Sequence, residues 1–403
     1  MSAEGAAPRP SRVLKVFLVV GEESGDQLGA SLMQALRSRL HDEVQFAGVG
    51  GAAMAREGLS SRFPLADVAL MGFLAVARGW PKVFARIRET AGAVLAEQPD
   101  VLVIIDSPDF THRVARRVRA NAPGIPIVNY VSPSVWAWRP GRAQAMRAYV
   151  DHVLALLPFE PAAHARLGSP ACTFVGHPVV EKIALLRPNE QEARRRLADP
   201  PVLLILPGSR RTEIRRLLAP FGETVARLQR AAGPLELVLP TLPHLHAELA
   251  EAIESWPIRP RLVTPDGKHA AFRIARAALA ASGTVTLELA LSGVPTVAAY
   301  RAARIEAAIL RRLVRLPSVI LPNLVLGENV VPEFLQEDCT PDRLAAALTP
   351  LLADTAARRL QLAAFSRLDQ VMAIGRAVPS AKAAEIVVAV AQNAPARSNA
   401  QYR

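Results

Sequence analysis

Short apolar runs alternate with longer stretches of mixed polarity along most of the chain. In the first half, the runs that predict buried strands are residues 13–20, 44–49, 101–105, 127–131, 153–157 and 173–175. In the second half, they are residues 202–206, 235–239, 261–263, 277–281 and 296–299. Buried runs of this length, separated by helical stretches, are typical of doubly wound parallel sheets. The pattern therefore predicts an α/β protein with two Rossmann-like domains that face a cleft.

The composition between the strands suggests where these domains divide. Residues 181–201 are rich in Pro, Arg and Glu and are the best candidate for a hinge. From about residue 341 the pattern is helical, with a last long helix over residues 380–390. We expect a flexible tail at residues 1–12, an N-terminal Rossmann-like domain at 13–185, a C-terminal Rossmann-like domain at 186–360, and C-terminal helices at 361–403.

The overall composition limits the class of protein. The chain has 403 residues, of which 51% are hydrophobic, and a net charge of +12. This length is sufficient for two cores, and the charge favours anionic partners such as phosphates, acidic lipids or nucleic acid. The two cysteines, Cys172 and Cys339, lie too far apart in the sequence to support a disulfide framework or a cysteine metal site. No apolar run approaches the ~20 residues that cross a bilayer, and residues 1–12 do not resemble a signal peptide. We therefore expect any contact with a membrane to be made at its cytoplasmic surface.

Two predicted strands of the second half end in turns that suit a phosphate. Gly208, Ser209 and Arg210 follow the run 202–206, and Ser282-Gly283-Thr284 follows the run 277–281. Backbone N–H groups at the start of a helix attract anions, and an arginine adds a fork of donors. Two such turns in one half of the chain suggest a diphosphate held between them, as in a nucleotide-sugar.

Acidic side chains follow strands of the first half. Glu22 comes after the run 13–20, and Asp106 and Asp109 come after the run 101–105. In doubly wound sheets ligands bind at the carboxyl ends of the strands, where a carboxylate could act as a general base on an acceptor hydroxyl. We assign this role to Asp106, with His177 as the alternative base, and expect Asp109 to cap the following helix. Beside Glu22, Ser24 and Asp26 are expected to cap the start of their own helix.

Two aromatic segments have both a structural and a functional interpretation. Trp136 and Trp138 follow the run 127–131 into a turn, where they would line the cleft wall or pack in the core. Before a basic helix at residues 82–95, an apolar segment could belong to the core or contact an anionic membrane surface; its members are Met71, Phe73, Leu74, Val76 and Trp80. A second basic amphipathic helix is expected at residues 302–316, with the same two interpretations.

Metal-binding motifs are absent from the sequence. It contains no Asp-x-Asp pair, no His-x-x-x-His and no Cys-x-x-Cys. A transferase that depends on a metal held by paired acids is therefore disfavoured, as is a zinc enzyme.

Taken together, these motifs resemble the lipid-A-disaccharide synthases, a family of inverting glycosyltransferases with a GT-B fold. The similarity runs from about residue 13 to residue 350. The segments that carry it are 21–26 (GEESGD), 48–51 (GVGG) with 71–72 (MG), 105–110 (IDSPDF), 130–139 (YVSPSVWAWR), 157–160 (LPFE) with 176–177 (GH), 206–210 (LPGSR) with Glu213, 281–284 (ASGT) with 287–288 (LE), and 321–323 (LPN).

The resemblance implies a reaction and a set of residues. A diacylglucosamine unit would pass from its UDP derivative to the 6-hydroxyl of diacylglucosamine 1-phosphate, giving a β-1,6-linked disaccharide and UDP, with no metal and no cofactor. The essential acid falls on Asp106 and the loop glutamate on Glu22. The residues that face UDP are Ser209, Arg210, Ser282, Gly283, Thr284, Glu288 and Asn323. At position 328 the chain has Glu where familiar members have Arg, so no phosphate role is transferred to Glu328.

Family properties also suggest partners and a location. The resemblance implies a cytoplasmic protein that binds peripherally to the inner face of the bacterial inner membrane. It also permits a homodimer, in which the final helices are exchanged rather than packed back on the N-terminal domain. Two other classes stay open. A soluble GT-B relative, such as a UDP-sugar epimerase or a peptidoglycan-type transferase, would share both phosphate turns but not Trp136 and Trp138. A basic nucleic-acid-binding protein would explain the charge alone, and we expect no nucleic acid partner.

Overall fold

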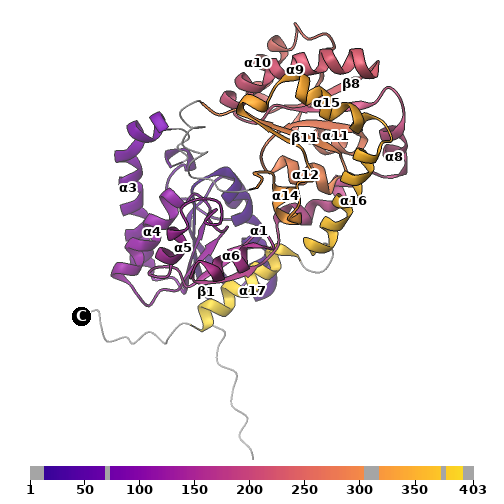
Figure 1. Ribbon diagram of the computed structural model, residues 1–403. Coiled ribbons are helices and arrows are strands. Elements are labelled where there is room, and N and C mark those ends of the chain that lie inside the picture. The colour runs from indigo at the N-terminus through magenta and orange to yellow at the C-terminus, as the bar shows by residue number, and fades with distance from the viewer. Residues whose placement is uncertain (1–12, 69–72, 304–316, 374–377, 394–403) are drawn as a thin grey trace, which may run out of the picture. The chain divides into compact units, whose positions relative to one another are not determined.

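The chain divides into two compact units in the computed structural model (Figure 1). Unit 1 comprises Met1–Pro178 and Gly375–Arg403, and unit 2 comprises Val179–Ile374. The structure describes residues 13–68, 73–303, 317–373 and 378–393, and for residues 73–80 it describes the backbone alone.

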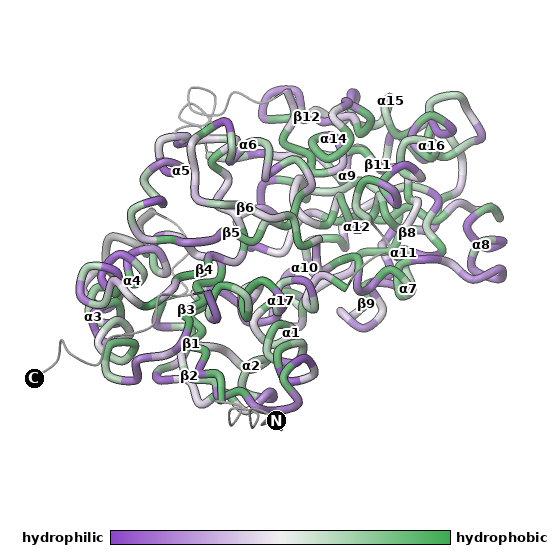
Figure 2. The backbone as a smooth tube through the Cα atoms, turned by 90° about the horizontal axis from the view of Figure 1, so that it is seen from below, coloured by the Kyte–Doolittle hydropathy of each residue, from purple (hydrophilic) through white to green (hydrophobic). Residues whose placement is uncertain are grey.

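Unit 1 is built on a six-stranded parallel sheet. Its strands run in the order β2-β1-β3-β4-β5-β6, with bounds β1 Leu14–Val20, β2 Val44–Val49, β3 Val101–Ile105, β4 Ile127–Tyr130, β5 His152–Ala155 and β6 Ala171–Phe174. All five residues of β3 are buried, as expected for a strand covered on both faces. Figure 2 shows β3 as a hydrophobic stretch, in contrast to the hydrophilic helix α8 (Glu190–Leu197) of unit 2.

Helices cover both faces of this sheet. They are α1 Glu23–Leu40, α2 Ala52–Arg56, α3 Phe73–Glu97, α4 Pro108–Asn121, α5 Gly141–Met146, α6 Glu160–Arg166 and α17 Pro379–Gln392. Alternate residues of β1 point to opposite faces. Val16 and Leu18 join a core with α1 and α17, whereas Phe17 and Val19 join a core with α3 and α4. The C-terminal helix α17 packs along α1, so in this structure the final helix lies on its own N-terminal unit.

Unit 2 repeats this architecture. Its strands run in the order β12-β11-β10-β7-β8-β9, with bounds β7 Val202–Leu206, β8 Glu236–Pro240, β9 Arg261–Val263, β10 Ala277–Ala281, β11 Thr296–Tyr300 and β12 Glu333–Leu335. Its longer helices are α8, α9 Arg211–Ala232, α15 Pro341–Leu352 and α16 Ala356–Val371, and its shorter ones are α7 Ile183–Leu186, α10 His246–Ala252, α11 Lys268–Ile274, α12 Val285–Leu291 and α14 Leu321–Leu326.

The predicted fold class is confirmed, and five strands have the bounds that the apolar runs predicted. No apolar run predicts strand β12, because its three residues are only partly buried. Residues 181–201, the hinge candidate, lie within unit 2, where α7 and α8 pack on α11. The predicted helix at residues 302–316 lies mostly outside the described residues.

Among the helices that the structure describes, none has both the length and the apolar character needed to cross a membrane.

Candidate active site

Each sheet has a topological switch point beside its first strand. In unit 1 the chain leaves β1 for β2 on one side and returns to β3 on the other. In unit 2 β7 lies between β8 and β10 in the same way. Ligands of open α/β sheets bind at the carboxyl ends of the strands at such points. The loops there carry Glu22 and Asp106 in unit 1, and Arg210 and Ser282–Thr284 in unit 2. The fold therefore brings the residues selected from the sequence to both switch points.

Asp106 is half-buried at the end of β3 and is held by its neighbours. Its Oδ2 atom accepts a hydrogen bond of 3.1 Å from Ser24 Oγ, and its Oδ1 atom accepts one of 2.8 Å from the Ser107 N–H. Its backbone carbonyl accepts a bond of 2.6 Å from Thr111 Oγ1. The carboxylate is therefore oriented from two elements, the loop that follows β3 and the first turn of α1.

The backbone around Asp106 is strained. The φ angles are 53° at Asp106, 44° at Ser107 and 77° at Val131, which follows the neighbouring strand β4. Such left-handed angles are uncommon outside glycine, and for a β-branched residue they are costly. Ser107 Oγ is also buried without a hydrogen-bond partner in the part of the chain that the structure describes. Strain and an unpaired polar atom at the same strand ends are the features of a functional loop.

The acids beside Asp106 do not all take the predicted positions. Glu22 is the half-buried N-cap residue of α1, but neither its own side chain nor that of Ser24 caps the helix. Asp26 is buried and accepts hydrogen bonds from the N–H groups of Gly51, Ala53 and Met54, at 2.7, 2.7 and 3.1 Å. The prediction that Ser24 and Asp26 cap their own helix is wrong. Asp26 instead caps α2, which β2 brings beside α1.

The structure also bears on Asp109, the expected cap of α4, and on His177, the alternative base. Asp109 makes no cap bond within α4 and forms an ion pair of 3.6 Å with Arg142. His177 is half-buried, and its desolvation lowers its pKa to about 4. A neutral imidazole can accept a proton, so His177 keeps the chemistry required of the alternative base.

The loop that follows β4 is fixed by α6. Trp136 donates from Nε1 to Glu160 Oε1 at 3.1 Å, and its ring meets Phe159 edge to face with centroids 5.0 Å apart. Ser132 Oγ lies 2.6 Å from His164 Nε2. Burial raises the pKa of Glu160, and bonds from Leu157 N–H and Trp136 oppose this shift. Trp136 is therefore half-buried in this loop, and its hydrogen bond to the buried carboxyl group of Glu160 orients its ring.

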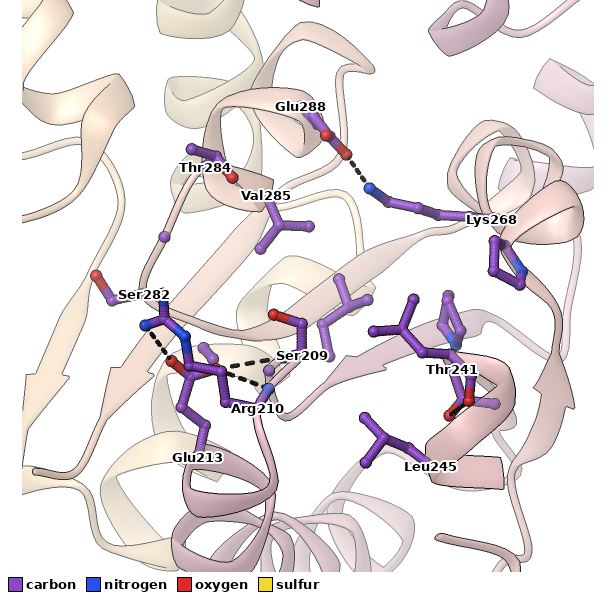
Figure 3. A pocket seen from close by; sticks show the side chains of 17 residues that line it. Ser209, Arg210, Glu213, Thr241, Leu245, Lys268, Ser282, Thr284, Val285 and Glu288 are labelled. Carbon is purple, nitrogen blue, oxygen red and sulfur yellow. Dashed lines mark hydrogen bonds and ion pairs between the residues drawn. The ribbon is translucent and has the colours of Figure 1, made fainter. Parts of the chain in front are cut away.

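A cavity of about 460 Å³ lies at the carboxyl ends of β7, β8, β9 and β10 (Figure 3). This volume falls in the range that holds small ligands and cofactors. The residues that line it are Leu206, Gly208, Ser209, Arg210, Glu213, Pro240, Thr241, Leu242, Leu245, Pro265, Lys268, Ala281, Ser282, Gly283, Thr284, Val285 and Glu288. Six of the seven residues predicted to face UDP are among them.

One side of the cavity is formed by the two turns that the sequence predicts to hold a phosphate, at Gly208–Arg210 and Ser282–Thr284. Arg210 is exposed at the start of α9, and its guanidinium lies 3.4 Å from Glu213 Oε1. Ser282, Gly283 and Thr284 precede α12, whose N-terminal end opens on the same cavity. Serine and threonine residues and an arginine thus line the cavity from two loops.

The other side carries an ion pair that the sequence did not reveal. Lys268 Nζ, at the start of α11, lies 2.5 Å from Glu288 Oε2 on α12 (Figure 3). Thr241, Leu245 and Pro265 complete this side with a more apolar surface. The available signal was the position of Lys268 at the start of the helix that follows β9, because the carboxyl ends of the strands meet at one edge of the sheet.

Asn323 does not line the cavity. It is buried, and its amide oxygen accepts from the N–H groups of Val330 and Val331, while its amide nitrogen donates to Ser318 Oγ and to the Val331 carbonyl. Its contact with UDP stays a prediction. Glu328, which follows the same helix α14, forms two hydrogen bonds of 2.9 and 2.7 Å with Arg367 of α16. Its carboxylate is therefore paired with a cation within its own unit.

The structure extends the predicted basic helix at its start, because α3 begins at Phe73 and so includes most of the apolar segment that the sequence placed before the helix. Met71 lies outside the described residues, and the side chains of Phe73, Leu74, Val76 and Trp80 are not described.

The two doubly wound units, each with loops at a switch point, define a GT-B-type fold. Among solved structures, the glycotransferase of kitacinnamycin matches with a TM-score of 0.62 and 18% identity, over 95% of this chain and 100% of that one. A UDP-GlcNAc 2-epimerase from Methanocaldococcus jannaschii, solved with UDP-GlcNAc and UDP, matches with a TM-score of 0.59 and 14% identity, over 93% and 100%. At these identities the likeness shows the fold alone.

Sequence similarity then gives the family. The family model for lipid-A-disaccharide synthetase matches residues 16–387. Lipid-A-disaccharide synthase of Nitrobacter winogradskyi is 62% identical over 393 residues, which cover 97% of this chain and 99% of that protein. The chain belongs to the lipid-A-disaccharide synthase family. The resemblance drawn from the motifs is confirmed, and it favours the synthase over the two other classes that the sequence left open.

Proposed function

We propose that this protein transfers a 2,3-diacylglucosamine unit from its UDP derivative to the 6-hydroxyl of 2,3-diacylglucosamine 1-phosphate. The products are UDP and the β-1,6-linked disaccharide 1-phosphate. Membership of the family makes the chain a glycosyltransferase of lipid A biosynthesis. The observation that carries the proposal is the cavity of unit 2, which combines two N–H-rich turns on one side with a carboxylate on the other.

The proposed donor contacts follow from the chemistry of this cavity. The diphosphate binds to Ser209 and Arg210 and to the turn at Ser282–Thr284, because these groups are hydrogen-bond donors at helix starts. Glu288 accepts hydrogen bonds from the ribose hydroxyls, while Lys268 balances its charge at 2.5 Å. Arg210 and the N–H groups stabilise the negative charge that develops on UDP as it leaves.

The proposed acceptor chemistry lies in unit 1. Asp106 takes the proton of the acceptor hydroxyl, and the oxygen attacks the anomeric carbon from the face opposite UDP. This attack inverts the anomeric configuration. The hydrogen bonds from Ser24 and Ser107 hold the carboxylate in one orientation, as a general base requires. Glu22 follows β1, the neighbour of β3 in the sheet, and we assign it to the catalytic site beside Asp106.

We also propose that the enzyme works peripherally at an anionic membrane surface. The net charge of +12 supports this, because it attracts the protein to an anionic membrane surface. A second reason is that both proposed substrates carry acyl chains, which hold them in a membrane. Met71, Phe73, Leu74, Val76 and Trp80 are the proposed contacts, and a homodimer is compatible with the proposal.

A direct assay tests the reaction. Purified protein is incubated in detergent with UDP-diacylglucosamine and diacylglucosamine 1-phosphate in the presence of a chelator, and UDP and disaccharide are both followed. Equal amounts of the two products support the proposal. UDP without disaccharide would contradict the acceptor assignment, and the lack of turnover by folded protein would contradict the substrate. UDP-GlcNAc serves as a control: its epimerisation would favour the function of the structurally similar epimerases instead.

A further inference from the structure

Glu213, the third residue of α9, contacts the turn at Gly208–Arg210 (Figure 3). Its Oε2 atom accepts hydrogen bonds from the backbone N–H groups of Ser209 and Arg210, at 3.2 and 3.4 Å, and its Oε1 atom lies 3.4 Å from the Arg210 guanidinium. Gly208 has a φ of 111°, and a Cβ atom there would lie 2.4 Å from Glu213 Oε2. The carboxylate therefore lies directly on the turn, where the absence of a side chain at position 208 makes room for it.

These three donors are the ones that the proposed function gives to the diphosphate. The carboxylate of Glu213 and a phosphate oxygen are both acceptors, and both are negatively charged. An N–H group that donates to one of them cannot at the same time form an equally good hydrogen bond to the other. Like charges at this separation also repel each other. Binding of a diphosphate at the turn must therefore compete with Glu213.

A second helix of unit 2 shows what the same arrangement looks like when it serves the helix alone. At the start of α8, Glu192 accepts from the Asn189 N–H at 3.0 Å and donates its own N–H to Asn189 Oδ1 at 2.9 Å. This is a closed capping box in which the N-cap side chain is an acceptor. At α9 the N-cap residue is Arg210, a donor, and the bonds to Glu213 are longer than the usual 2.9–3.0 Å. Weak bonds of this kind are easily exchanged for those of a stronger acceptor.

We propose that Glu213 is an internal anion that competes with the diphosphate of the nucleotide for Ser209 and Arg210. It lowers the affinity for UDP but not for uridine, so that the product UDP leaves readily. When UDP has left, Glu213 accepts the hydrogen bonds of the Ser209 and Arg210 N–H groups. The inference rests on the proposed function, since it concerns the same cavity, and Glu213 acts on the ligand through the turn rather than on the reacting atoms.

The test compares two ligands that differ only in the diphosphate. The dissociation constants of UDP and of uridine are measured by calorimetry for the full-length protein and for Glu213→Gln. The amide keeps an oxygen that can accept the N–H bonds but removes the charge. We expect UDP to bind about tenfold more tightly to the variant, which corresponds to the loss of about one unfavourable charge contact. Uridine should bind within about twofold of the original value.

A matched control separates this effect from a general change of charge. Glu248 lies on α10 and pairs with Arg211 and Arg215 of the same helix α9, at 3.3 Å each, but does not line the cavity. Glu248→Gln should leave both dissociation constants unchanged. Glu213→Ala, checked for folding by circular dichroism, should shift the ratio of UDP to uridine affinity in the same direction as Glu213→Gln.

The outcomes distinguish this inference from the proposed function. Unchanged or weaker UDP binding by folded Glu213→Gln, with UDP bound normally by the original protein, would overturn the inference and leave the function intact. Equal weakening of UDP and uridine would show that Glu213 is only a helix cap. If the original protein binds no UDP, the proposed function is wrong and the inference falls with it.

Discussion

A Cβ atom added to Gly21 would lie 2.5 Å from the Cβ of Ser107 and 2.8 Å from its hydroxyl oxygen. The loops that follow β1 and β3 are therefore in direct contact at the switch point of unit 1. This contact leaves no space for a side chain at position 21. It also links the residue before Glu22 to the residue after Asp106, so the two acids belong to one packed assembly.

Gly21→Ala should disturb the acceptor side. The new methyl group forces Ser107 to move, and the carboxylate of Asp106 moves with it, since it accepts the Ser107 N–H. We expect a loss of about 1–3 kcal/mol in the free energy of unfolding, and at least a tenfold lower kcat with unchanged UDP binding. Gly92→Ala is the matched control. Gly92 is an exposed helical glycine of α3 with nothing within 4 Å of an added Cβ, so this change should be neutral or slightly stabilising.

Asp106→Asn should abolish proton transfer without disturbing the donor site. The amide can keep the bond from Ser24 but cannot act as a base. We expect kcat to fall about 10³-fold, with the dissociation constant of UDP unchanged. Asp109→Asn, which affects only the ion pair with Arg142, should keep at least half of the activity. Turnover retained by Asp106→Asn would move the general base elsewhere, first to His177.

Glu288→Ala should weaken recognition of the ribose. Loss of a carboxylate acceptor inside the cavity is expected to raise the dissociation constant of UDP about tenfold. For 2′,3′-dideoxy-UDP, which lacks the hydroxyls, the variant and the original protein should bind equally weakly. Glu223→Ala removes an acid from α9 that does not line the cavity, and should change neither constant. An equal loss for both nucleotides would mean that Glu288 supports only the structure of α12 through Lys268.

His112 should make unit 1 sensitive to acid. Burial, and then the nearby Arg142 and Arg116, lower its pKa from 6.5 to about 3. Between these values the unfolded chain binds a proton that the folded chain does not. The stability that depends on a neutral His112 is therefore fully present above pH 6.5, and the free energy of unfolding decreases as the pH falls below this value. The His112 contribution to this decrease is about 2 kcal/mol between pH 6.5 and pH 5.

Urea unfolding at pH 7 and pH 5 measures this effect. His112→Gln, which removes the titrating ring and its hydrogen bond with Tyr149 Oη, should be less stable at pH 7 but lose less stability on acidification than the original protein. His41→Asn changes an exposed histidine in the left-handed region, which asparagine tolerates, and should keep the original pH dependence. An identical pH dependence in His112→Gln would show that this histidine is not held neutral in the folded state.

The sequence determined the features that depend on neighbouring residues. Continuous apolar runs such as 101–105 and 277–281 predicted strands with the observed bounds, because a parallel strand covered on both faces needs every residue to be apolar. The turns at Gly208–Arg210 and Ser282–Thr284 were recognisable for a similar reason. A strand end, a small residue and a helix start are all local signals, and the motif order around them was sufficient to recognise the family.

Only the tertiary structure decided which distant groups meet. No local pattern encodes the order of the strands, which brings α2 beside α1. Asp26 therefore caps α2, whereas the sequence predicted that it caps its own helix α1. It likewise joins Trp136 to Glu160, and Lys268 to Glu288. Glu213 was visible in the motif, but its position on the turn depends on how α9 leaves β7. Such pairs form between residues that are distant in the sequence, so they depend on the packing of the whole chain and cannot be read from local sequence patterns.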